Sequence, residues 1–274
     1  GRSALDSNTT ADNNTAVGHA SLAANTTGTS NTAVGKSALA ANITGSNHTA
    51  LGKDALLVST AGGYDTALGD SVLKANTTGN YNTGVGASAL AANTTASDNT
   101  AVGSNSLTAN TTGTRMTSVG SRSGMQNTTG NYNAFFGYDA GESNTTGASN
   151  TFVGDSAGRE TTTASNNTAV GQSALLANTT GAQNTAIGTA SLTVNTTGLE
   201  NFAGGYAALD ANTTASYGTA VGARALQRNT TGANNTGLGY KALFANTTGD
   251  SNVGLGSETL LGNVTGDANT AVGR

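Results

Sequence analysis

The stretch Asn14-Thr-Ala-Val-Gly-His-Ala-Ser-Leu-Ala-Ala-Asn-Thr-Thr-Gly-Thr-Ser30 decides the fold, because variants of it begin again at Asn31, at His48 and at every seventeenth residue thereafter. Fifteen full units run from Asn14 to Ala268 without an insertion, and partial units precede and follow them. The consensus is N-T-A-V-G-x-S-A-L-x-A-N-T-T-G-x-x, whose places are called positions 1 to 17. A fixed period of this kind indicates a repeat architecture in which each unit packs on its neighbours.

The length of the unit selects the class of repeat. The unit is too short for the helical pairs of ankyrin-type repeats, and it lacks the spacing of leucine-rich repeats. The remaining class is all-β, a parallel β-solenoid with coils of 17 residues, about 16 of them, each hydrogen-bonded to the next at about 4.8 Å. We expect residues 1–274 to be a single uninterrupted repeat domain and a section of a longer fibre.

Position 5 is Gly in every unit. Such strictness implies a positive φ or a neighbour too close for a Cβ atom. We predict a structural turn at Gly18, Gly35, Gly52, Gly69, Gly86, Gly103, Gly120, Gly137, Gly154, Gly171, Gly188, Gly205, Gly222, Gly239, Gly256 and Gly273.

The segment Thr-Ala-Val at positions 2 to 4 has the composition of a strand. Position 4 is apolar in every unit except at Gly204, and in that same unit position 2 is Phe202. A large residue at position 2 that coincides with a missing one at position 4 suggests that both enter the same interior space. We therefore predict that positions 2 and 4 point inward and that the Ala at position 3 points outward.

A second apolar column is expected at position 9, which is Leu in most units. Its exceptions, Gly124, Gly141 and Gly158, fall in consecutive units, and large residues lie beside them in the sequence. These large residues are Phe135, Phe136 and Phe152. The Phe side chains thus replace, from the opposite wall of the coil, the volume of the missing Leu side chains. We expect a second strand at positions 11 to 14, where Thr is frequent, and positions 7 to 10 could form either a strand or a short helical turn.

Charged residues support the register, because residues one unit apart should be lateral neighbours. Lys53 and Asp70 share position 6, and Glu142 and Arg159 share position 10. Opposite charges one coil apart add a few tenths of a kcal/mol at an exposed edge. Charges gather at positions 6, 7, 10, 16 and 17, which we expect to be solvated corners.

The tripeptide Asn-x-Thr recurs at position 12 and is formally an N-glycosylation site. The acceptors are Asn8, Asn25, Asn42, Asn76, Asn93, Asn110, Asn127, Asn144, Asn178, Asn195, Asn212, Asn229, Asn246 and Asn263. If positions 9, 11 and 13 point inward, the Asn at position 12 points outward and could carry a glycan. The alternative is that these side chains form an unmodified ladder of amides.

The composition excludes several classes of function. Charged residues make up 9% of the chain, against about 25% in typical domains, and 11 Lys and Arg with a net charge of -4 provide no basic field for nucleic acid. No apolar run in this segment is long enough to predict a membrane span. His19 and His48 have no acid or thiol near them in the sequence, so we expect no catalytic, cofactor or metal site.

Two polar columns could bind a ligand. Threonine columns at positions 2, 13 and 14 are similar to those of ice-binding solenoids, but the Thr at position 2 is expected to be buried. Tyrosines occur only at positions 17 and 6, where they either pack against corners or contact sugars. These residues are Tyr64, Tyr81, Tyr132, Tyr217, Tyr138, Tyr206 and Tyr240.

The stretches Thr32–Leu39 and Thr168–Leu175, which read Thr-Ala-Val-Gly-x-x-Ala-Leu, resemble the coils of trimeric autotransporter adhesin heads. The whole chain also resembles Asn-Thr-rich repeats of phage tail-fibre-like and bacterial surface-fibre proteins. The resemblance implies a left-handed parallel β-roll, a homotrimer, and a place outside the cell.

The sequence thus favours a non-enzymatic structural or adhesive fibre that is extracellular or lies on a cell or virion surface. Its expected partners are further copies of itself, by end-to-end stacking or as a homotrimer, and glycans or a host surface. The alternative is a carbohydrate- or ice-binding solenoid. No cofactor is expected.

Overall fold

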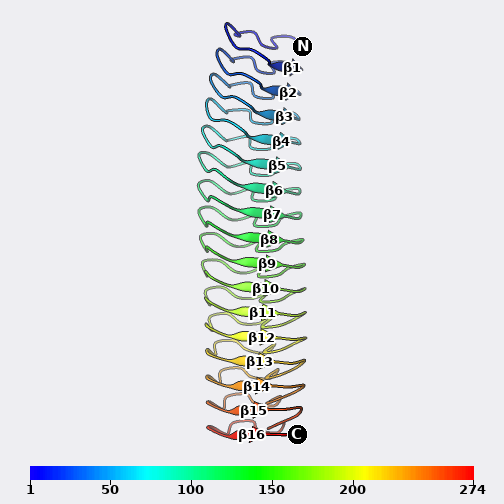
Figure 1. The fold of residues 1–274 in the computed structure, drawn as a ribbon, viewed down its shortest axis with the longest axis vertical. Coiled ribbons are helices and arrows are strands. Elements are labelled where there is room, and N and C mark those ends of the chain that lie inside the picture. Colours follow the sequence, from blue (N-terminus) through cyan, green and yellow to red (C-terminus); the bar gives the residue numbers. More distant parts are fainter. The chain divides into compact units, whose positions relative to one another are not determined.

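The computed structural model describes residues 1–274 and contains strands but no helix (Figure 1). Two compact units are present, Gly1–Asn133 and Ala134–Arg274. The first unit contains β1 (Thr15–Val17), β2 (Thr32–Val34), β3 (Thr49–Leu51), β4 (Thr66–Leu68), β5 (Thr83–Val85), β6 (Thr100–Val102) and β7 (Thr117–Val119). The second contains β8 (Ala134–Phe136), β9 (Thr151–Val153), β10 (Thr168–Val170), β11 (Thr185–Ile187), β12 (Phe202–Gly204), β13 (Thr219–Val221), β14 (Thr236–Leu238), β15 (Val253–Leu255) and β16 (Thr270–Val272).

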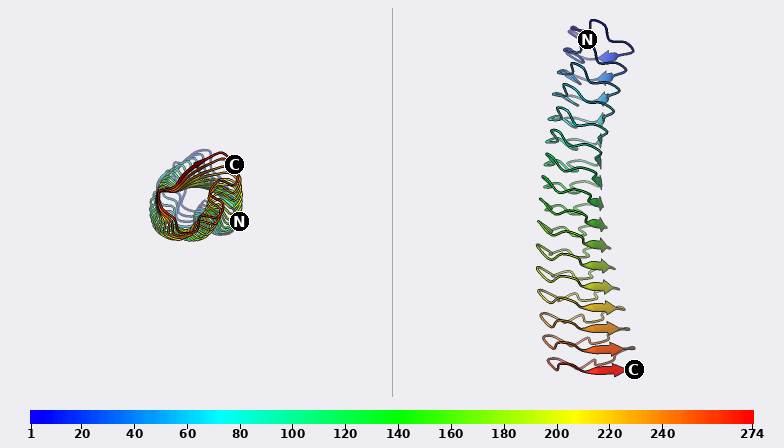
Figure 2. Two further views of the ribbon diagram at one scale, coloured as in Figure 1. Left: turned by 90° about the horizontal axis from the view of Figure 1, so that it is seen from below. Right: turned by 60° about the vertical axis from the view of Figure 1, so that its left-hand side comes forward.

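Within each unit, every strand pairs in parallel with the next. The register joins residues one repeat apart, so that Thr32 lies opposite Thr49 in the first unit and Thr168 opposite Thr185 in the second. Figure 2 shows the strand at the same place in successive coils of each unit. The predicted parallel β-solenoid is confirmed. Its left-handed sense and its single uninterrupted domain stay predictions.

The strand side chains point in the opposite direction to the one expected. Ala33 and Ala67, at position 3, are fully buried, whereas Thr32 and Leu51, at positions 2 and 4, face outward. The prediction was wrong because the interior of so short a coil is narrow. The position that faces this interior takes a small side chain, while β-branched residues support the extended backbone from the outer face.

Positions 7 to 10 form a turn built from left-handed residues. Ser37 and Leu39 have φ values of 59° and 50°. The N–H of Leu39 donates to the carbonyl of Ala55 in the following coil at 3.0 Å, and the N–H of Ser37 donates to that of His19 in the preceding coil at 2.9 Å. These bonds and the burial of the Leu side chain offset the roughly 1–2 kcal/mol that a left-handed conformation costs a residue with a Cβ atom.

The second strand expected at positions 11 to 14 does not form. In its place, three donors converge on one carbonyl of the next coil. The N–H and the hydroxyl of Thr111 both donate to the carbonyl of Thr128 at 3.0 Å, and the N–H of Thr112 donates to it at 3.2 Å. A strand ladder gives each carbonyl one N–H partner, so this convergence excludes it. Thr at position 13 serves as a hydrogen-bonding group rather than as a strand former.

The turn predicted at position 5 is confirmed for both of the reasons that favour glycine. Gly35 has a φ of 138°, and a Cβ atom added to it would overlap the carbonyl of Gly52 in the next coil. A side chain here would therefore be strained and would also prevent the coils from stacking.

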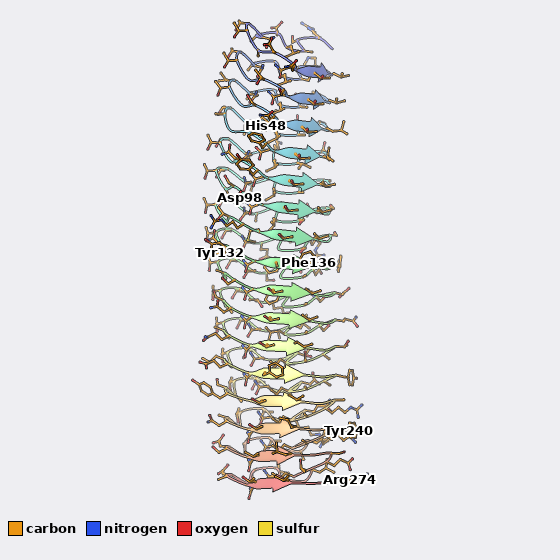
Figure 3. The ribbon with its side chains drawn as sticks, in the orientation of Figure 1. His48, Asp98, Tyr132, Phe136, Tyr240 and Arg274 are labelled. Atoms are coloured by element: carbon orange, nitrogen blue, oxygen red, sulfur yellow. The ribbon has the colours of Figure 1, made fainter.

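The exchange of Leu for Phe in the core is confirmed in part. Phe135 and Phe152 are fully buried and stack with their ring centroids 5.3 Å apart. A Cβ atom added to Gly141 would lie 2.7 Å from the Phe135 ring, and one added to Gly158 would lie 2.5 Å from the Phe152 ring. The rings thus occupy the space that Leu fills in other coils. Phe136 is not part of this exchange, because it projects outward from the end of β8 (Figure 3).

Phe202 and Gly204 compensate each other as predicted, but on the outer face. Phe202 is exposed, and a Cβ atom added to Gly204 would lie 3.2 Å from the Phe202 ring. The ring therefore covers the place of the missing side chain from outside the coil.

Candidate functional site

The Asn side chains at position 12 form a buried ladder of amides. Asn110, for example, donates from Nδ2 to Oδ1 of Asn93 in the preceding coil at 3.0 Å and to the carbonyl of Gly113 in its own coil at 2.9 Å. Its Oδ1 accepts from Nδ2 of Asn127 at 2.9 Å. Within a narrow interior, each such bond satisfies a polar group that water cannot reach.

Of the two alternatives for this Asn column, the outward direction on which a glycan depends is therefore excluded for the buried residues. The column turns inward because its amide satisfies the carbonyl at position 15, which the turn leaves facing the interior. Among the acceptors of the Asn-x-Thr tripeptides, Asn8 is exposed and Asn263 half-buried, and all those between them are buried. In Asn110 both Nδ2 hydrogens already donate, so no N–H is free to carry a sugar in the folded coil. The folded chain contains the amide ladder that was the alternative, and the glycan stays a prediction for Asn8 and Asn263.

A second amide column, at position 1, was not foreseen. Asn99 donates from Nδ2 to the carbonyl of Gly113 at 2.9 Å, and its Oδ1 accepts the backbone N–H of Met116 at 3.0 Å. The carbonyl of Gly113 thus accepts from Asn99 and from Asn110. The recurrence of Asn at position 1 in most copies was the available signal.

The position 1 column contains a buried pair of titratable side chains, His48 and Asp65. His48 lies beside the start of β3, inside the coil (Figure 3). Its Nδ1 accepts the backbone N–H of Asp65 at 3.4 Å and lies 3.5 Å from Asp65 Oδ2. The Asp65 carboxylate also accepts from the N–H of Asn82 at 2.8 Å, from Asn82 Nδ2 at 3.1 Å and from Asn76 Nδ2 at 3.0 Å. The expectation that no acid lies beside His48 is wrong, and the separation of the two by one full repeat would have revealed the pair.

Burial shifts the pKa values of both side chains of this pair away from their values in the unfolded chain. Desolvation raises the pKa of Asp65 to about 7, although the hydrogen bonds from Asn82 and Asn76 act in the opposite direction. Desolvation also lowers the pKa of His48 to about 4. Between these values the folded pair consists of a carboxylic acid and a neutral imidazole. In the unfolded chain at about pH 5 the same groups are a carboxylate and an imidazolium. Burial therefore favours the uncharged forms of both side chains.

In each unit, positions 2 and 4 form the outer face of the strands, which is uncharged. No charged residue occurs at either position in any of the 16 strands. Aliphatic side chains are open to solvent on it, including Leu51 at 50% exposure and Ile187 at 44%. In the first unit, position 2 is Thr in seven successive coils, from Thr15 to Thr117. Exposed apolar surface that runs on from coil to coil is typical of an interaction site.

The predicted solvated corners are confirmed in part: the tyrosines are exposed, whereas Asp139 at position 7 and Glu142 at position 10 are buried. Lys53 lies 3.8 Å from Asp70, and Arg159 lies 3.2 Å from Glu142, so both expected pairs form. The rings of Tyr64 and Tyr81, at position 17, stack with their centroids 5.1 Å apart while remaining exposed.

No enclosed pocket, no cluster of three metal-ligating side chains and no helix capable of crossing a membrane is present. No protein-family model matches the chain, and no curated protein matches it.

Proposed function

We propose that this chain is a non-enzymatic structural section of an extracellular surface fibre and that its outer strand face associates side by side with further copies. The uncharged, partly aliphatic outer face is the observation that carries this proposal. A free soluble chain gains nothing from exposing Leu51 and Ile187 in a column without charges, whereas a fibre buries such a column between subunits.

The size of this face fits the proposal. Each coil contributes about 4.8 Å along the stack and about 10 Å along its three-residue strand, or roughly 50 Å². The seven strands of the first unit then give roughly 350 Å² and the nine strands of the second roughly 450 Å², which is the size that each partner contributes to a small, reversible interface. A homotrimer would use this face, whereas end-to-end stacking would use strand edges.

Sedimentation velocity of charge variants tests the association. Lys substitutions at Val85, Val102 and Val119 place three charges on the outer face of the first unit and should reduce self-association at least tenfold. Ala87→Lys, Ser104→Lys and Ser121→Lys add the same charges to position 6 of the same coils and serve as the matched control. A chain that stays monomeric at high concentration, or association that the two sets weaken equally, would contradict the proposal.

A second candidate, ice binding, gains support from the corrected direction of the strand side chains. The Thr at position 2 was expected to be buried, yet in β1 to β7 it lies on the outer face at the coil spacing of about 4.8 Å. Such a regular array of hydroxyl and methyl groups can hold water in a repeating arrangement.

An assay of the inhibition of ice recrystallisation tests this function. Tyr at Thr66, Thr83 and Thr100 should abolish inhibition, whereas Tyr at Thr78, Thr95 and Thr112 should not. Inhibition by a monomeric chain would favour this candidate over the fibre.

A further inference from the structure

Cations and aromatic rings alternate along one corner of the second unit. We call this surface the basic-aromatic edge, and it consists of Tyr206, Arg224, Arg228, Tyr240, Lys241 and Phe244. The Arg224 guanidinium lies 5.9 Å from the centre of the Tyr206 ring, and that of Arg228 lies 4.9 Å from the centre of the Phe244 ring. The Lys241 ammonium lies 5.1 Å from the Tyr240 ring centre and 5.6 Å from that of Phe244. Each cation thus rests against a ring, which orients it without neutralising it.

The cations of this edge have no acidic partner, in contrast to Lys53 and Arg159. Lys53 and Arg159 each form an ion pair with a carboxylate. No carboxylate oxygen lies within 4.0 Å of the charged groups of Arg224, Arg228 or Lys241. Three positive charges therefore lie on two successive coils whose one acidic residue is Asp250, while Asp210 and Glu258 belong to the coils on either side. A local excess of this kind indicates an anionic partner.

The aromatic rings add a second recognition element. Tyr206 and Tyr240 both occupy position 6, two coils apart, which places them about 9.6 Å from each other along the stack. Ala223, which has a small side chain, lies between them in the same column. Both rings are about half exposed, at 53% and 47%, and Tyr240 lies just beyond the end of β14 (Figure 3). Two open rings at about the length of a disaccharide suit the apolar faces of alternate sugars.

We infer that the basic-aromatic edge binds an acidic polysaccharide along the stacking direction of the coils. Sugar rings would lie against Tyr206 and Tyr240, and their carboxylate or sulfate groups would accept hydrogen bonds from Arg224, Arg228 and Lys241. An open edge suits a linear polymer, which needs no pocket. Nucleic acid fits less well, because three cations neutralise few phosphates and the chain as a whole repels a polyanion of that charge density. This inference is independent of the fibre role.

Affinity electrophoresis in gels that contain polygalacturonate, with neutral dextran gels as the reference, tests the inference. The chain should be retarded by polygalacturonate alone, and added salt should weaken the retardation. The variant R224Q/R228Q/K241Q should bind at least tenfold more weakly, and Y206A/Y240A should also lose affinity. R115Q is the matched control, because Arg115 lies 5.6 Å from the Tyr132 ring centre as an isolated pair in the first unit and should leave binding unchanged.

Three results would overturn the inference. They are no retardation at low salt, equal loss in R115Q and in the triple variant, and tighter binding of single-stranded DNA than of polygalacturonate. Arg224 and Arg228 are exposed and Lys241 is half-buried, so each variant should fold, and circular dichroism checks this. The single variant R224Q should weaken binding in proportion, which keeps the result interpretable if the triple variant unfolds.

Discussion

The coils around His48 and the coils around Phe152 both depart from the consensus, but they are repaired differently. Near His48 the amide ladder is interrupted at Ser59, which leaves Oδ1 of Asn42 without a partner, and Asp65 accepts the free Nδ2 of Asn76. Near Phe152 the leucine column is interrupted by Gly158, and the ring fills the space.

The difference between the two repairs follows from the kind of interaction that is restored. Apolar packing has no direction, so a ring from one wall replaces a Leu from the other without requiring a hydrogen-bond partner. Hydrogen bonds need a donor and an acceptor in line, so the polar repair is incomplete and brings ionisable groups into the interior. Nε2 of His48 also lacks a partner. Substitutions can therefore separate a repair by volume from a repair by hydrogen bonding.

The largest effect is expected from the apolar repair. Phe152→Ala should lower the free energy of unfolding by about 3–5 kcal/mol, because it leaves a cavity. Gly158→Leu should cost about 1–3 kcal/mol through overlap with the ring. The backbone itself accepts Leu, since Leu175 has a φ of 55° at the equivalent position. The double variant should recover most of the stability in urea unfolding. A double variant no more stable than Phe152→Ala would contradict exchange by volume.

A somewhat smaller effect is expected at the polar repair. Asp65→Ala removes the acceptor of three hydrogen bonds from Asn76 and Asn82 and should cost about 3 kcal/mol. Asp65→Asn keeps an acceptor oxygen and should cost less. Ser59→Ala is the control, because the hydroxyl makes a single long contact of 3.5 Å to the carbonyl of Ala61, and it should change the stability by less than about 1 kcal/mol. Equal losses for the three variants would show that Asp65 does not repair the ladder.

The pH dependence of stability sharpens the comparison further, because only the polar repair titrates. The raised pKa of Asp65 makes stability fall as the pH rises from about 4 to about 7, and the lowered pKa of His48 makes it rise from about pH 4 to about 6.5. The two slopes oppose each other, so the unmodified chain should vary little over this range. His48→Asn should leave the falling slope and Asp65→Asn the rising one, each on the order of 2 kcal/mol. Urea midpoints from pH 4.5 to 7.5 measure this, and slopes of the same sign would refute it.

The smallest effect is expected at Thr161, the second interruption of the position 12 ladder. Its Oγ1 is buried and has no hydrogen-bond partner. Thr161→Val removes the unsatisfied hydroxyl at nearly the same volume, so it should leave stability unchanged or raise it by up to about 1 kcal/mol. Asn110→Ala breaks three hydrogen bonds of the intact ladder and should lower the free energy of unfolding by about 3 kcal/mol. Thermal unfolding of both variants measures this. A loss above about 1 kcal/mol for Thr161→Val would imply a partner for its hydroxyl.

The period and the glycine turn could be predicted from the sequence because each rests on strict recurrence. The exchange of Phe135 and Phe152 for Leu could be predicted because two deviations coincide. The direction of the strand side chains could not be predicted, because Thr and Val suit either face of a three-residue strand. They face outward because the interior of the coil is too narrow for them. The Asn-x-Thr tripeptide has the same sequence whether the Asn110 side chain points inward or outward. The left-handed Leu39 has no local signal, since Leu seldom adopts that conformation.

The uniform turn at position 5, with φ between 114° and 144° throughout, also affects how the length of such a chain can change. Every coil leaves this turn in the same direction and presents the same donors to its successor, so a cut in one coil can be rejoined to the equivalent point of another. Loss or gain of whole units keeps every column in register, whereas a change by any fraction of a unit displaces the glycines. Recombination between near-identical repeats of a gene produces such steps. Length can thus be inherited and varied by copying errors while the interior of each coil is retained.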